Sequence, residues 1–458
     1  MARSFPQIRR LDGPGALRAR LAELDCDLPV DDRVLPAGPL AEPLDHGGWQ
    51  LANRLAVLPM EGWDATTDGR PTELLRRRWT RFGASGAGLV WGGEAVAVDP
   101  AGRANPHQLC IGATSEADLA GLRALLGDDQ VVGLQLTDSG RWSRPEGVPT
   151  PRTAGRHPLL DGRVGAGADD VLSDTQLDDL VGAFVGAATV ARQSGFDFVD
   201  VKHCHGYLLH ELLAMPDRPG PYGGSFEGRT RFLRRVVEGI RRDAPGLGIG
   251  VRLSVFDLAP PDQLDRGEAY PYAFGGDGTG AGIDLTEPHR FCELLIDLGV
   301  QLLCVTAGSP YYVPHAQRPA YFPPSDGYPP PHDPLLDVTR LQQVARDLTR
   351  AHPQLLVVGS GLTYLQEYFG HVAQALVDRG WMHVAGYGRM ALSLPSLAAD
   401  LLAGEEPARG SICRTFSDCT TAPRHGLVSG CFPLDAHYRA MPERLELGRI
   451  KRAAKEPR

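Results

Sequence analysis

The chain has 458 residues, enough for one large domain with additions and a sizeable buried core. Its 47 lysines and arginines against 56 aspartates and glutamates give a formal net charge of −9, without a basic run before the last residues, which argues against nucleic acid as a partner. No apolar run is long enough to span a membrane, the N-terminus has no apolar signal segment, and eight cysteines are too few for a disulfide scaffold. We therefore expect a soluble, cytoplasmic protein that acts on small molecules. Whether it forms a homo-oligomer is left open.

Short β-branched runs alternate with longer amphipathic stretches along most of the chain, which is typical of repeated strand-helix units with a parallel sheet. Glycine ends several of the helical stretches. The predicted strands cover residues 54–58, 88–92, 131–136, 196–201, 248–253, 301–305, 355–358 and 383–385. The clearest helical patterns cover residues 72–83, 175–195, 229–244, 290–299, 338–351 and 365–380. Eight such units predict an α/β fold, a closed TIM (β/α)8 barrel.

The barrel leaves a segment at each end of the chain. Residues 1–50 are interpreted as an N-terminal cap, residues 51–403 as the barrel, and residues 404–458 as a C-terminal extension with three cysteines. Two long connections, residues 139–174 and 256–287, leave the C-terminal ends of predicted strands, which is the face where barrel enzymes keep their active sites. We expect both connections to shape a pocket.

Polar side chains stand where successive predicted strands end. A strand of a barrel is buried on both faces, so a charged or amide side chain there is costly unless it finds a partner. The side chains could pair with one another at the barrel mouth, or they could form a ring of hydrogen-bonding groups around a bound planar heterocycle. They are Glu61, Glu94, Gln135, Lys202, His205, Arg252 and Thr306.

The last two predicted strands end in glycine-rich turns, "VVGSGL" and "VAGYGRM". In such turns the backbone N–H groups can approach an anion closely, and Arg389 can pair with it. Two glycine-rich turns on the final strands form the usual phosphate site of a barrel. A phosphate site together with a ring of hydrogen-bonding groups suggests FMN.

The stretch "VKHCHGYLLHELL" contains four side chains that could hold a metal ion, those of His203, Cys204, His205 and His210. On a strand His203 and His205 would point to the same side, but His210 lies in the following turn or helix. No recognised zinc spacing is met. Metal binding is therefore the less favoured interpretation, and our predicted site contains no metal.

The segment "HGYLLHELLAMPDRPGPYGGSFEGRTRFLRRVVEGIR" resembles a signature of the old yellow enzyme family of FMN-dependent NAD(P)H:flavin oxidoreductases. The blocks "NRLAVLPM", "GLVWGGEAVAVDPAGR", "QLTDSGR", "VRLS" and "GYGR" resemble other family blocks in the same order, over about residues 51–403. The likeness includes the 2,4-dienoyl-CoA reductase and trimethylamine dehydrogenase branches, without their C-terminal domains. It implies an FMN-binding barrel that uses NADH or NADPH as reductant.

The resemblance also implies roles for individual residues. Tyr207 corresponds to the family tyrosine that donates a proton to the substrate carbon, and a phenol with an ordinary pKa of about 10 remains protonated at neutral pH. Lys202 and His205 correspond to the pair that binds the substrate oxygen. The residues implied to contact FMN, at its ring or its phosphate, are Pro59, Met60, Glu61, Ala95, Gln135, Arg252, Ser360, Gly361, Gly388 and Arg389.

Two positions depart from the family pattern. Lys202 stands where the family usually has a histidine, and it would donate to an oxyanion as a mobile point charge rather than as a planar ring. Glu61 stands where relatives often have threonine or cysteine beside the flavin. An ionised Glu61 would disfavour the reduced anionic flavin, whereas a protonated one could donate a hydrogen bond.

Three cysteines cluster after the barrel, Cys413, Cys419 and Cys431. The dienoyl-CoA reductase branch binds a 4Fe-4S cluster in this region. The interval between Cys419 and Cys431 fits that motif, but one ligand is missing and the first interval is one residue short. Because a complete cluster normally takes four thiolates, a structural role for these cysteines is favoured over iron–sulfur binding.

The leading functional hypothesis is hydride transfer from NAD(P)H through FMN N5 to an activated alkene of the enone, enoate or enoyl type. Lys202 and His205 would polarise the carbonyl group, and Tyr207 would protonate the α-carbon. Two alternatives remain open at this point. One is an FMN-dependent dehydrogenase of an amine or alcohol, and the other is a flavin-binding redox protein with low turnover.

Overall fold

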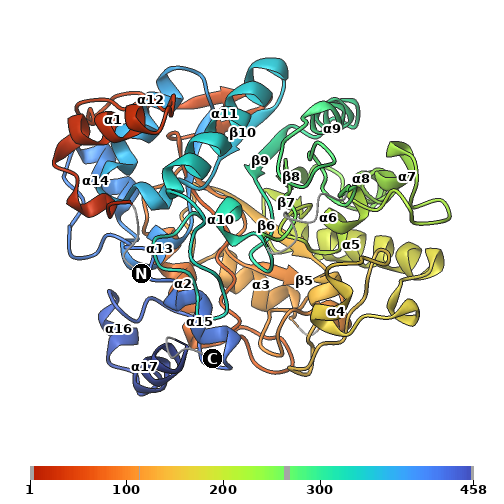
Figure 1. Cartoon of the computed structure of the whole chain (residues 1–458). Helices are drawn as coiled ribbons and strands as arrows, with labels where there is room; N and C mark the ends of the chain where they lie inside the picture. The colour runs from red at the N-terminus through yellow and green to blue at the C-terminus, as the bar shows by residue number, and fades with distance from the viewer. Residues whose placement is uncertain (1–4, 113, 262–268, 455–458) are drawn as a thin grey trace.

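Eight parallel strands close into a barrel in a computed structural model that describes residues 5–112, 114–261 and 269–454 (Figure 1). The order around the barrel is β3, β4, β6, β7, β8, β9, β10 and β11, and β11 pairs in parallel with β3. The predicted TIM (β/α)8 barrel is therefore confirmed. The barrel strands are β3 (Leu55–Val57), β4 (Leu89–Val90), β6 (Val131–Thr137), β7 (Phe198–Val201), β8 (Gly248–Ser254), β9 (Leu302–Thr306), β10 (Leu356–Gly359) and β11 (Val384–Tyr387).

Each of the eight predicted strands overlaps a barrel strand, and every end lies within two residues of its predicted position. Three further short strands were not predicted. β5 (Ala95–Ala97) joins the sheet beside β6, with Ala95 opposite Gln135, and β1 (Leu44–His46) forms an antiparallel hairpin with β2 (Trp49–Leu51) ahead of the barrel. These three strands lie outside the repeated strand-helix units on which the prediction was based.

The outer layer consists of helices that follow the strands, and all six predicted helices are present as α2, α5, α8, α9, α11 and α12. In α2 the side chain of Thr72 caps the first turn, and Leu75, Trp79 and Phe82 recur at helical spacing on the buried face. The main helices are α1 (Gly13–Glu23), α2 (Glu73–Gly83), α3 (Glu116–Arg123), α5 (Asp174–Gln193), α8 (Arg231–Asp243), α9 (Thr286–Asp297), α11 (Pro334–Ala351), α12 (Phe369–Asp378) and α14 (Leu397–Ala403).

Shorter helices lie in the connections, at strand ends and after the barrel. They are α4 (Asp161–Val164), α6 (Leu208–Leu213), α7 (Phe226–Arg229), α10 (Pro314–Gln317), α13 (Arg389–Ser393), α15 (Asp418–Arg424), α16 (Ala436–Arg439) and α17 (Glu443–Ala453), with 3-10 helices η1 (Ile8–Arg10), η2 (Pro100–Gly102), η3 (Gly140–Trp142), η4 (Ala168–Asp170) and η6 (Leu362–Tyr368). Across the described ranges, no helix is both long and apolar enough to cross a membrane.

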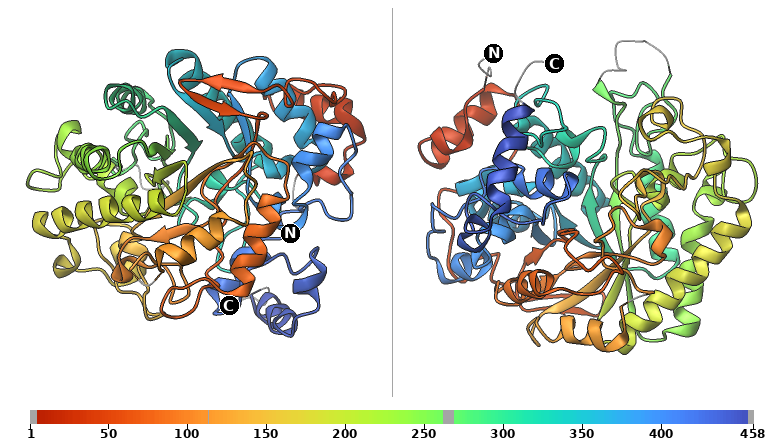
Figure 2. Two further views of the ribbon diagram at one scale, coloured as in Figure 1. Left: turned by 180° about the vertical axis from the view of Figure 1, so that it is seen from behind. Right: turned by 90° about the horizontal axis from the view of Figure 1, so that it is seen from below.

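The two terminal segments pack against the same side of the barrel (Figure 2). The Tyr368 hydroxyl donates to the Leu11 carbonyl at 2.6 Å and accepts from the Gly13 N–H at 3.1 Å, which joins the start of α1 to η6. Arg77 of α2 binds Asp435 at 2.9 Å, which joins the C-terminal extension to the first barrel helix. The extension therefore reaches the barrel mouth, where α15 takes part in the site described below.

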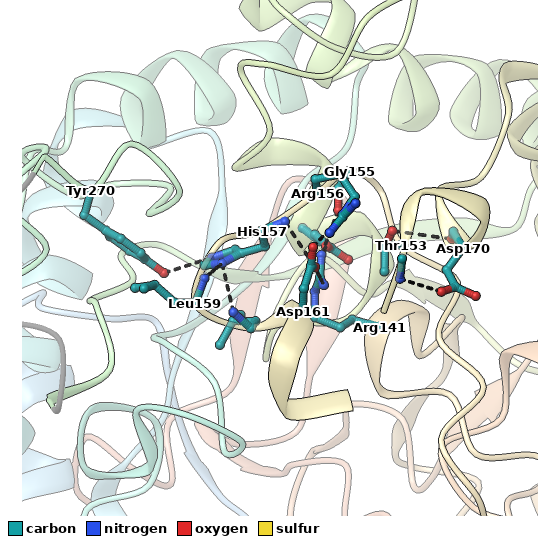
Figure 3. A network of polar contacts seen from close by, with 12 residues as sticks. Arg141, Thr153, Gly155, Arg156, His157, Leu159, Asp161, Asp170 and Tyr270 are labelled. Carbon is teal, nitrogen blue, oxygen red and sulfur yellow. Dashed lines mark hydrogen bonds and ion pairs between the residues drawn. The ribbon is translucent and has the colours of Figure 1, made fainter. Parts of the chain in front are cut away.

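A buried polar network holds the long connection 139–174 (Figure 3). Arg141, of which 1% of the side chain is exposed, binds Asp161 and Glu211 and donates to the Gly155 carbonyl at 2.8 Å. The His157 ring lies 3.2 Å from the Tyr270 hydroxyl of the other long connection, so the two connections are joined. Part of that second connection, residues 262–268, lies outside the described residues.

Candidate active site

A cavity opens at the C-terminal ends of the barrel strands and contains about 1040 Å³ of empty space, solvent at its mouth included. This size suits a small-molecule or cofactor site. The walls combine strand ends with α10 and with α15 of the C-terminal extension. Its lining residues are Leu58, Pro59, Met60, Glu61, Trp63, Gln135, Lys202, His205, Tyr207, Arg252, Pro310, Tyr311, Gln317, Arg318, Ser360, Gly361, Thr363, Gly388, Arg389, Cys419, Thr420, Pro423 and Arg424.

The structure brings almost all of the sequence-predicted site residues together around this cavity. All three predicted catalytic residues line it, as do nine of the ten predicted cofactor contacts. Ala95 is the exception. It is buried in β5, and its carbonyl accepts a hydrogen bond from the Gln108 amide at 3.0 Å.

Asp200 organises one end of the cavity from inside the barrel. Its carboxylate accepts from Trp91 Nε1 at 2.7 Å, from Gln135 Nε2 at 2.5 Å and from the Arg252 N–H at 2.7 Å. Burial raises the pKa of Asp200 above its ordinary value, against the effect of these hydrogen bonds. Asp200 thus orients Gln135 and the Arg252 backbone, while the Arg252 Nε atom is buried with no partner among the described residues.

The two positions that depart from the family pattern form an ion pair with each other. The Lys202 ammonium binds Glu61 Oε1, and the Tyr207 hydroxyl donates to Glu61 Oε2 at 3.0 Å. Lys202 Nζ also lies 3.9 Å from the centre of the Tyr207 ring. Only 1% of the Lys202 side chain and 21% of the Glu61 side chain are exposed. The lysine charge is therefore compensated inside the site rather than free for an oxyanion.

Tyr207 remains protonated in this environment. Burial, and then the charge of Glu61, raise the pKa of Tyr207 well above its ordinary value. Its hydroxyl also lies 3.2 Å from the hydroxyl of Tyr311, and burial raises the pKa of Tyr311 to about 12. The cavity wall thus contains two neighbouring phenols that can donate protons, with a carboxylate beside one of them.

His205 is neutral and held at a strained position. Burial, and then the charges of Arg252 and Lys202, hold the pKa of His205 well below its ordinary value. Gln317 Nε2 lies 3.1 Å from His205 Nε2, a contact that requires the ring proton on Nδ1 when the Gln317 amide donates. His205 has a φ of 67°, and hydrogen bonds to Ser254 and Ser309 hold its backbone there.

A second buried ion cluster supports the turn that carries Glu61. Glu94 accepts from the Gly62 N–H at 2.8 Å and binds Arg78 at 2.5 Å, and Arg78 also binds Asp64 at 2.6 Å. The side chains of all three charged residues are at most 4% exposed. Glu94, one of the strand-end residues, therefore acts behind the cavity wall and positions the backbone next to Glu61.

The opposite end of the cavity is positively charged. Arg389 Nη2 donates to the Pro319 carbonyl at 2.9 Å, but its Nη1 atom is buried without a partner in the described chain. Arg318 binds Thr420, whereas its Nε and Nη2 atoms are buried and have no acceptor among the residues described. Burial, and then the charges of Arg424 and Arg389, lower the pKa of Arg318 to about 9. An anion at this end would relieve that repulsion.

These features fit FMN. Unpartnered guanidinium nitrogens of Arg252, Arg318 and Arg389 surround one cavity and would find acceptors in the oxygens of a flavin ring and a phosphate. Gly361 adopts a φ of 83° in the turn after β10, a conformation that favours glycine. A Cβ atom at Gly388 would lie 2.9 Å from the Met60 sulfur, so glycine keeps this part of the wall compact.

The alternative metal sites find no support in the described ranges, where no group of three or more His, Cys, Asp or Glu side chains could hold a metal ion. His203 lies against the Val201 carbonyl at 2.7 Å, and His210 accepts from the Gly206 N–H at 2.9 Å. The cysteines Cys413, Cys419 and Cys431 line one small gap beside Arg389, and burial raises the pKa of Cys413 to about 11. Cys413 is buried and Cys419 and Cys431 are half-buried, and three cysteines are one short of the four thiolates that a complete cluster takes.

Sequence reasoning missed several residues of the site. Asp200 could have been noticed, because a carboxylate inside the apolar run "FDFVDV" needs buried partners. Gln317, Arg318 and Arg424 gave no signal, since they lie in or directly after α10 and α15, helices of four and seven residues that are too short to show a periodicity. The structure also places Tyr311 in the cavity wall.

Comparison with curated proteins identifies relatives among bacterial oxidoreductases. Residues 39–270, just over half of the chain, match the NADH:flavin oxidoreductase / NADH oxidase family. The NADPH dehydrogenase of Bacillus subtilis (strain 168) is 27% identical over 282 residues, which cover 59% of this chain and 73% of that protein. The NADPH dehydrogenase of Clostridium acetobutylicum is 30% identical over 202 residues, 43% of this chain and 57% of that protein.

Solved structures share the fold. An old yellow enzyme homologue from Zymomonas mobilis has a TM-score of 0.57 and 20% identity, over 81% of this chain and 95% of its own. A 2-naphthoyl-CoA reductase complex has a TM-score of 0.65 and 16% identity, over 87% of this chain and 57% of its own, so the chain spans little more than half of that protein. Fold, cavity and family match agree that this chain belongs to the NADH:flavin oxidoreductase / NADH oxidase family and is an FMN-dependent NAD(P)H oxidoreductase.

Proposed function

We propose that the protein reduces an activated alkene, of the enone, enoate or enoyl type, at the expense of NAD(P)H. The observation that carries this proposal is the buried, protonated hydroxyl of Tyr207 in the wall of the cavity. Alkene reduction requires a proton donor beside the hydride donor, and a phenol with a raised pKa keeps its proton over the whole neutral range.

The cofactor would extend from the Gln135 and Arg252 end of the cavity to the turns after β10 and β11. Gln135 and Arg252 would hold the ring, and Ser360, Gly361, Gly388 and Arg389 would hold the phosphate, with Arg318 as an additional partner. Pro59, Met60 and Glu61 would border the ring from the turn after β3. FMN supplies the exchange of hydride between NAD(P)H and the substrate.

His205 would bind the substrate carbonyl oxygen. The neutral imidazole carries a proton on Nδ1 when Gln317 donates to Nε2. A hydrogen bond from Nδ1 would draw electron density toward the oxygen and make the alkene a better hydride acceptor. Lys202 would contribute less to polarising the carbonyl group, because its charge is paired with Glu61.

Proton delivery by Tyr207 requires its hydroxyl to turn from Glu61 toward the substrate carbon. The Tyr311 hydroxyl, 3.2 Å away, would then restore the proton. The charge of Glu61 makes a tyrosinate at Tyr207 costly, so the proton must be replaced as it leaves.

A second candidate function is the oxidation of an amine or alcohol. The observation that favours it is the carboxylate of Glu61, which accepts the Tyr207 hydrogen bond at 3.0 Å. In an oxidation, Tyr207 could take a proton from the substrate heteroatom while passing its own proton to Glu61. The same contacts would then serve proton removal instead of proton delivery.

An anaerobic spectral titration separates these candidates and the low-turnover alternative. Alkene reduction predicts that NADH or NADPH bleaches the flavin absorbance and that an enone restores it. Bleaching by an amine or alcohol alone would support the dehydrogenase. No bleaching by either class of reductant would contradict both enzymatic candidates and leave a flavin-binding redox protein, whereas purified protein without FMN would contradict all three.

A further inference from the structure

A second, larger chamber adjoins the cofactor cavity and has no part in the function proposed above. It contains about 1420 Å³ of empty space, again with solvent at its mouth. Trp63, Tyr311, Pro423 and Arg424 line both cavities, so the two share a wall. The chamber lies between the turns after β3, β5 and β6 on one side and the segment after α15 on the other.

Tyr311 connects the chamber to the reacting end of the site. Its hydroxyl lies 3.2 Å from the Tyr207 hydroxyl, and its ring stacks on Trp142 with centroids 4.2 Å apart and planes 4° apart. A molecule whose reacting carbon lies near Tyr207 could therefore continue past Tyr311 into the chamber. The stack also presents a flat aromatic surface that suits a planar group.

The chamber is lined by apolar groups and by charged side chains, of which Asp64, Asp326 and Arg424 have ionic partners while the exposed Arg144 has none among the described residues. Leu74, Leu427 and Val428 form part of the apolar wall. Arg424 binds Asp326 at 2.7 Å, and Asp64 is held by Arg78. A charged ligand would gain little from these compensated pairs, whereas an apolar ligand would remove half-buried side chains from water.

We propose that this chamber binds the tail of the substrate, an uncharged and largely apolar planar group attached to the reacting alkene. The inference rests on the proposed alkene reduction. Trp63 and Trp142 each carry a buried indole N–H without an acceptor in the described residues, so an oxygen acceptor on the tail would find donors nearby. The chamber would therefore favour elongated, aromatic or polycyclic enones and enals as substrates.

The test compares two enals with the same reacting group on the holoenzyme. One is crotonaldehyde, and the other carries a biphenyl group joined to the methyl carbon of crotonaldehyde through one methylene. Burial of the aromatic tail should raise kcat/KM of the tailed enal roughly tenfold or more over that of crotonaldehyde. Equal values for the two enals would overturn the inference.

A pair of matched variants places the effect in the chamber. Leu427→Arg puts a charge into the apolar wall and should lower the kcat/KM ratio of tailed to short enal by about fivefold or more. Leu445→Arg is the control, because Leu445 lies on α17 and is 72% exposed, and it should keep the wild-type ratio. An unchanged ratio in Leu427→Arg, or a raised KM for NADPH instead, would assign the chamber to another ligand or to none.

A binding measurement separates the failure of this inference from failure of alkene reduction. The saturated amide with the same biphenyl tail should quench tryptophan fluorescence of the holoenzyme and bind more weakly to Leu427→Arg, whose folding is checked by thermal unfolding. If neither enal is reduced but this binding pattern holds, alkene reduction is wrong and the apolar-tail site stands. Equal binding to both proteins would contradict the site regardless of turnover.

Discussion

Glu61 and Lys202 both depart from the family pattern, and each provides the charge that the other needs as a counter-ion. A lysine at the family's histidine position would be an uncompensated buried charge, but Glu61, 141 residues away in the sequence, provides the carboxylate. The sequence revealed both residues but not their contact, since a pairing across the barrel has no local signature. The pair also fixes where the Tyr207 hydroxyl points.

Removing one member of this pair should cost more stability than removing both. Glu61→Gln leaves the Lys202 ammonium buried without a counter-charge, which should lower the free energy of unfolding by about 3 kcal/mol. Glu61→Gln combined with Lys202→Met should recover at least about 1 kcal/mol of that loss. Urea unfolding of the wild type, both single variants and the double variant measures the coupling, and strict additivity would refute the pair.

Arg318 and Arg389 should select FMN over riboflavin. Either Arg318→Gln or Arg389→Gln removes a charged hydrogen-bond donor from the anion end, which should weaken FMN binding to the apoprotein by about 10- to 100-fold. Riboflavin lacks the phosphate, so its affinity should change little. Flavin fluorescence titrations give both affinities. An Arg318→Gln protein that loses affinity for both flavins equally would place Arg318 away from the phosphate.

At the scale of elements, buried ionic clusters rather than regular structure hold the segments around the site. The connection 139–174 contains only short helices, and its conformation depends on Arg141 at the centre of the network in Figure 3. The turn after β3 depends in a similar way on Arg78 and Glu94. Such segments show no periodicity, which is why the sequence predicted their position but not their form.

Arg141→Met should loosen this connection. The change leaves the carboxylates of Asp161 and Glu211 without their shared counter-charge and should cost about 3 to 5 kcal/mol of unfolding free energy. Arg156→Met is the matched control, because Arg156 binds the same Asp161 but its side chain is 57% exposed, and it should cost less than about 1 kcal/mol. Denaturant unfolding and limited proteolysis check both variants, and equal losses would contradict the network.

Asp257 links the end of β8 to the segment after β9 and gives a pH-dependent prediction. Burial raises the pKa of Asp257 to about 7, although the Tyr312 hydroxyl and the Leu258 N–H donate to its carboxyl group. At pH values between the ordinary pKa of an aspartate and this raised pKa, the Asp257 carboxyl is protonated in the folded state and ionised in the unfolded state. The Asp257 contribution to stability therefore falls as pH rises.

Asp257→Asn removes that titration. The stability deficit of the variant relative to the wild type should be about 2 to 3 kcal/mol smaller near pH 7 than near pH 5. Urea unfolding of both proteins at the two pH values, with FMN saturating, provides the measurement. A deficit that instead grows with pH would mean that Asp257 is ionised in the folded protein.

For the whole molecule, the barrel and most of the cavity could be predicted because they depend on local patterns. Strand and helix periodicities located all eight barrel strands, and residues at strand ends converge at the mouth of any closed barrel. The contribution of α15 could not be predicted, since the extension after residue 403 reaches the mouth only through tertiary contacts such as Arg77 with Asp435. The strand-end pattern pointed to Lys202 as a residue of the barrel mouth, but its ion pair with Glu61 is visible only in the folded chain.

In the proposed alkene reduction, Tyr207 would supply the proton that accompanies hydride transfer from FMN. Tyr207→Phe tests this role most directly when the two half-reactions are measured separately by anaerobic stopped-flow absorbance. NAD(P)H should bleach the variant's flavin at the wild-type rate, while reoxidation by an enal should slow by about 10²- to 10⁴-fold. Reoxidation at the wild-type rate, or loss of bleaching by NAD(P)H with FMN still bound, would contradict this role.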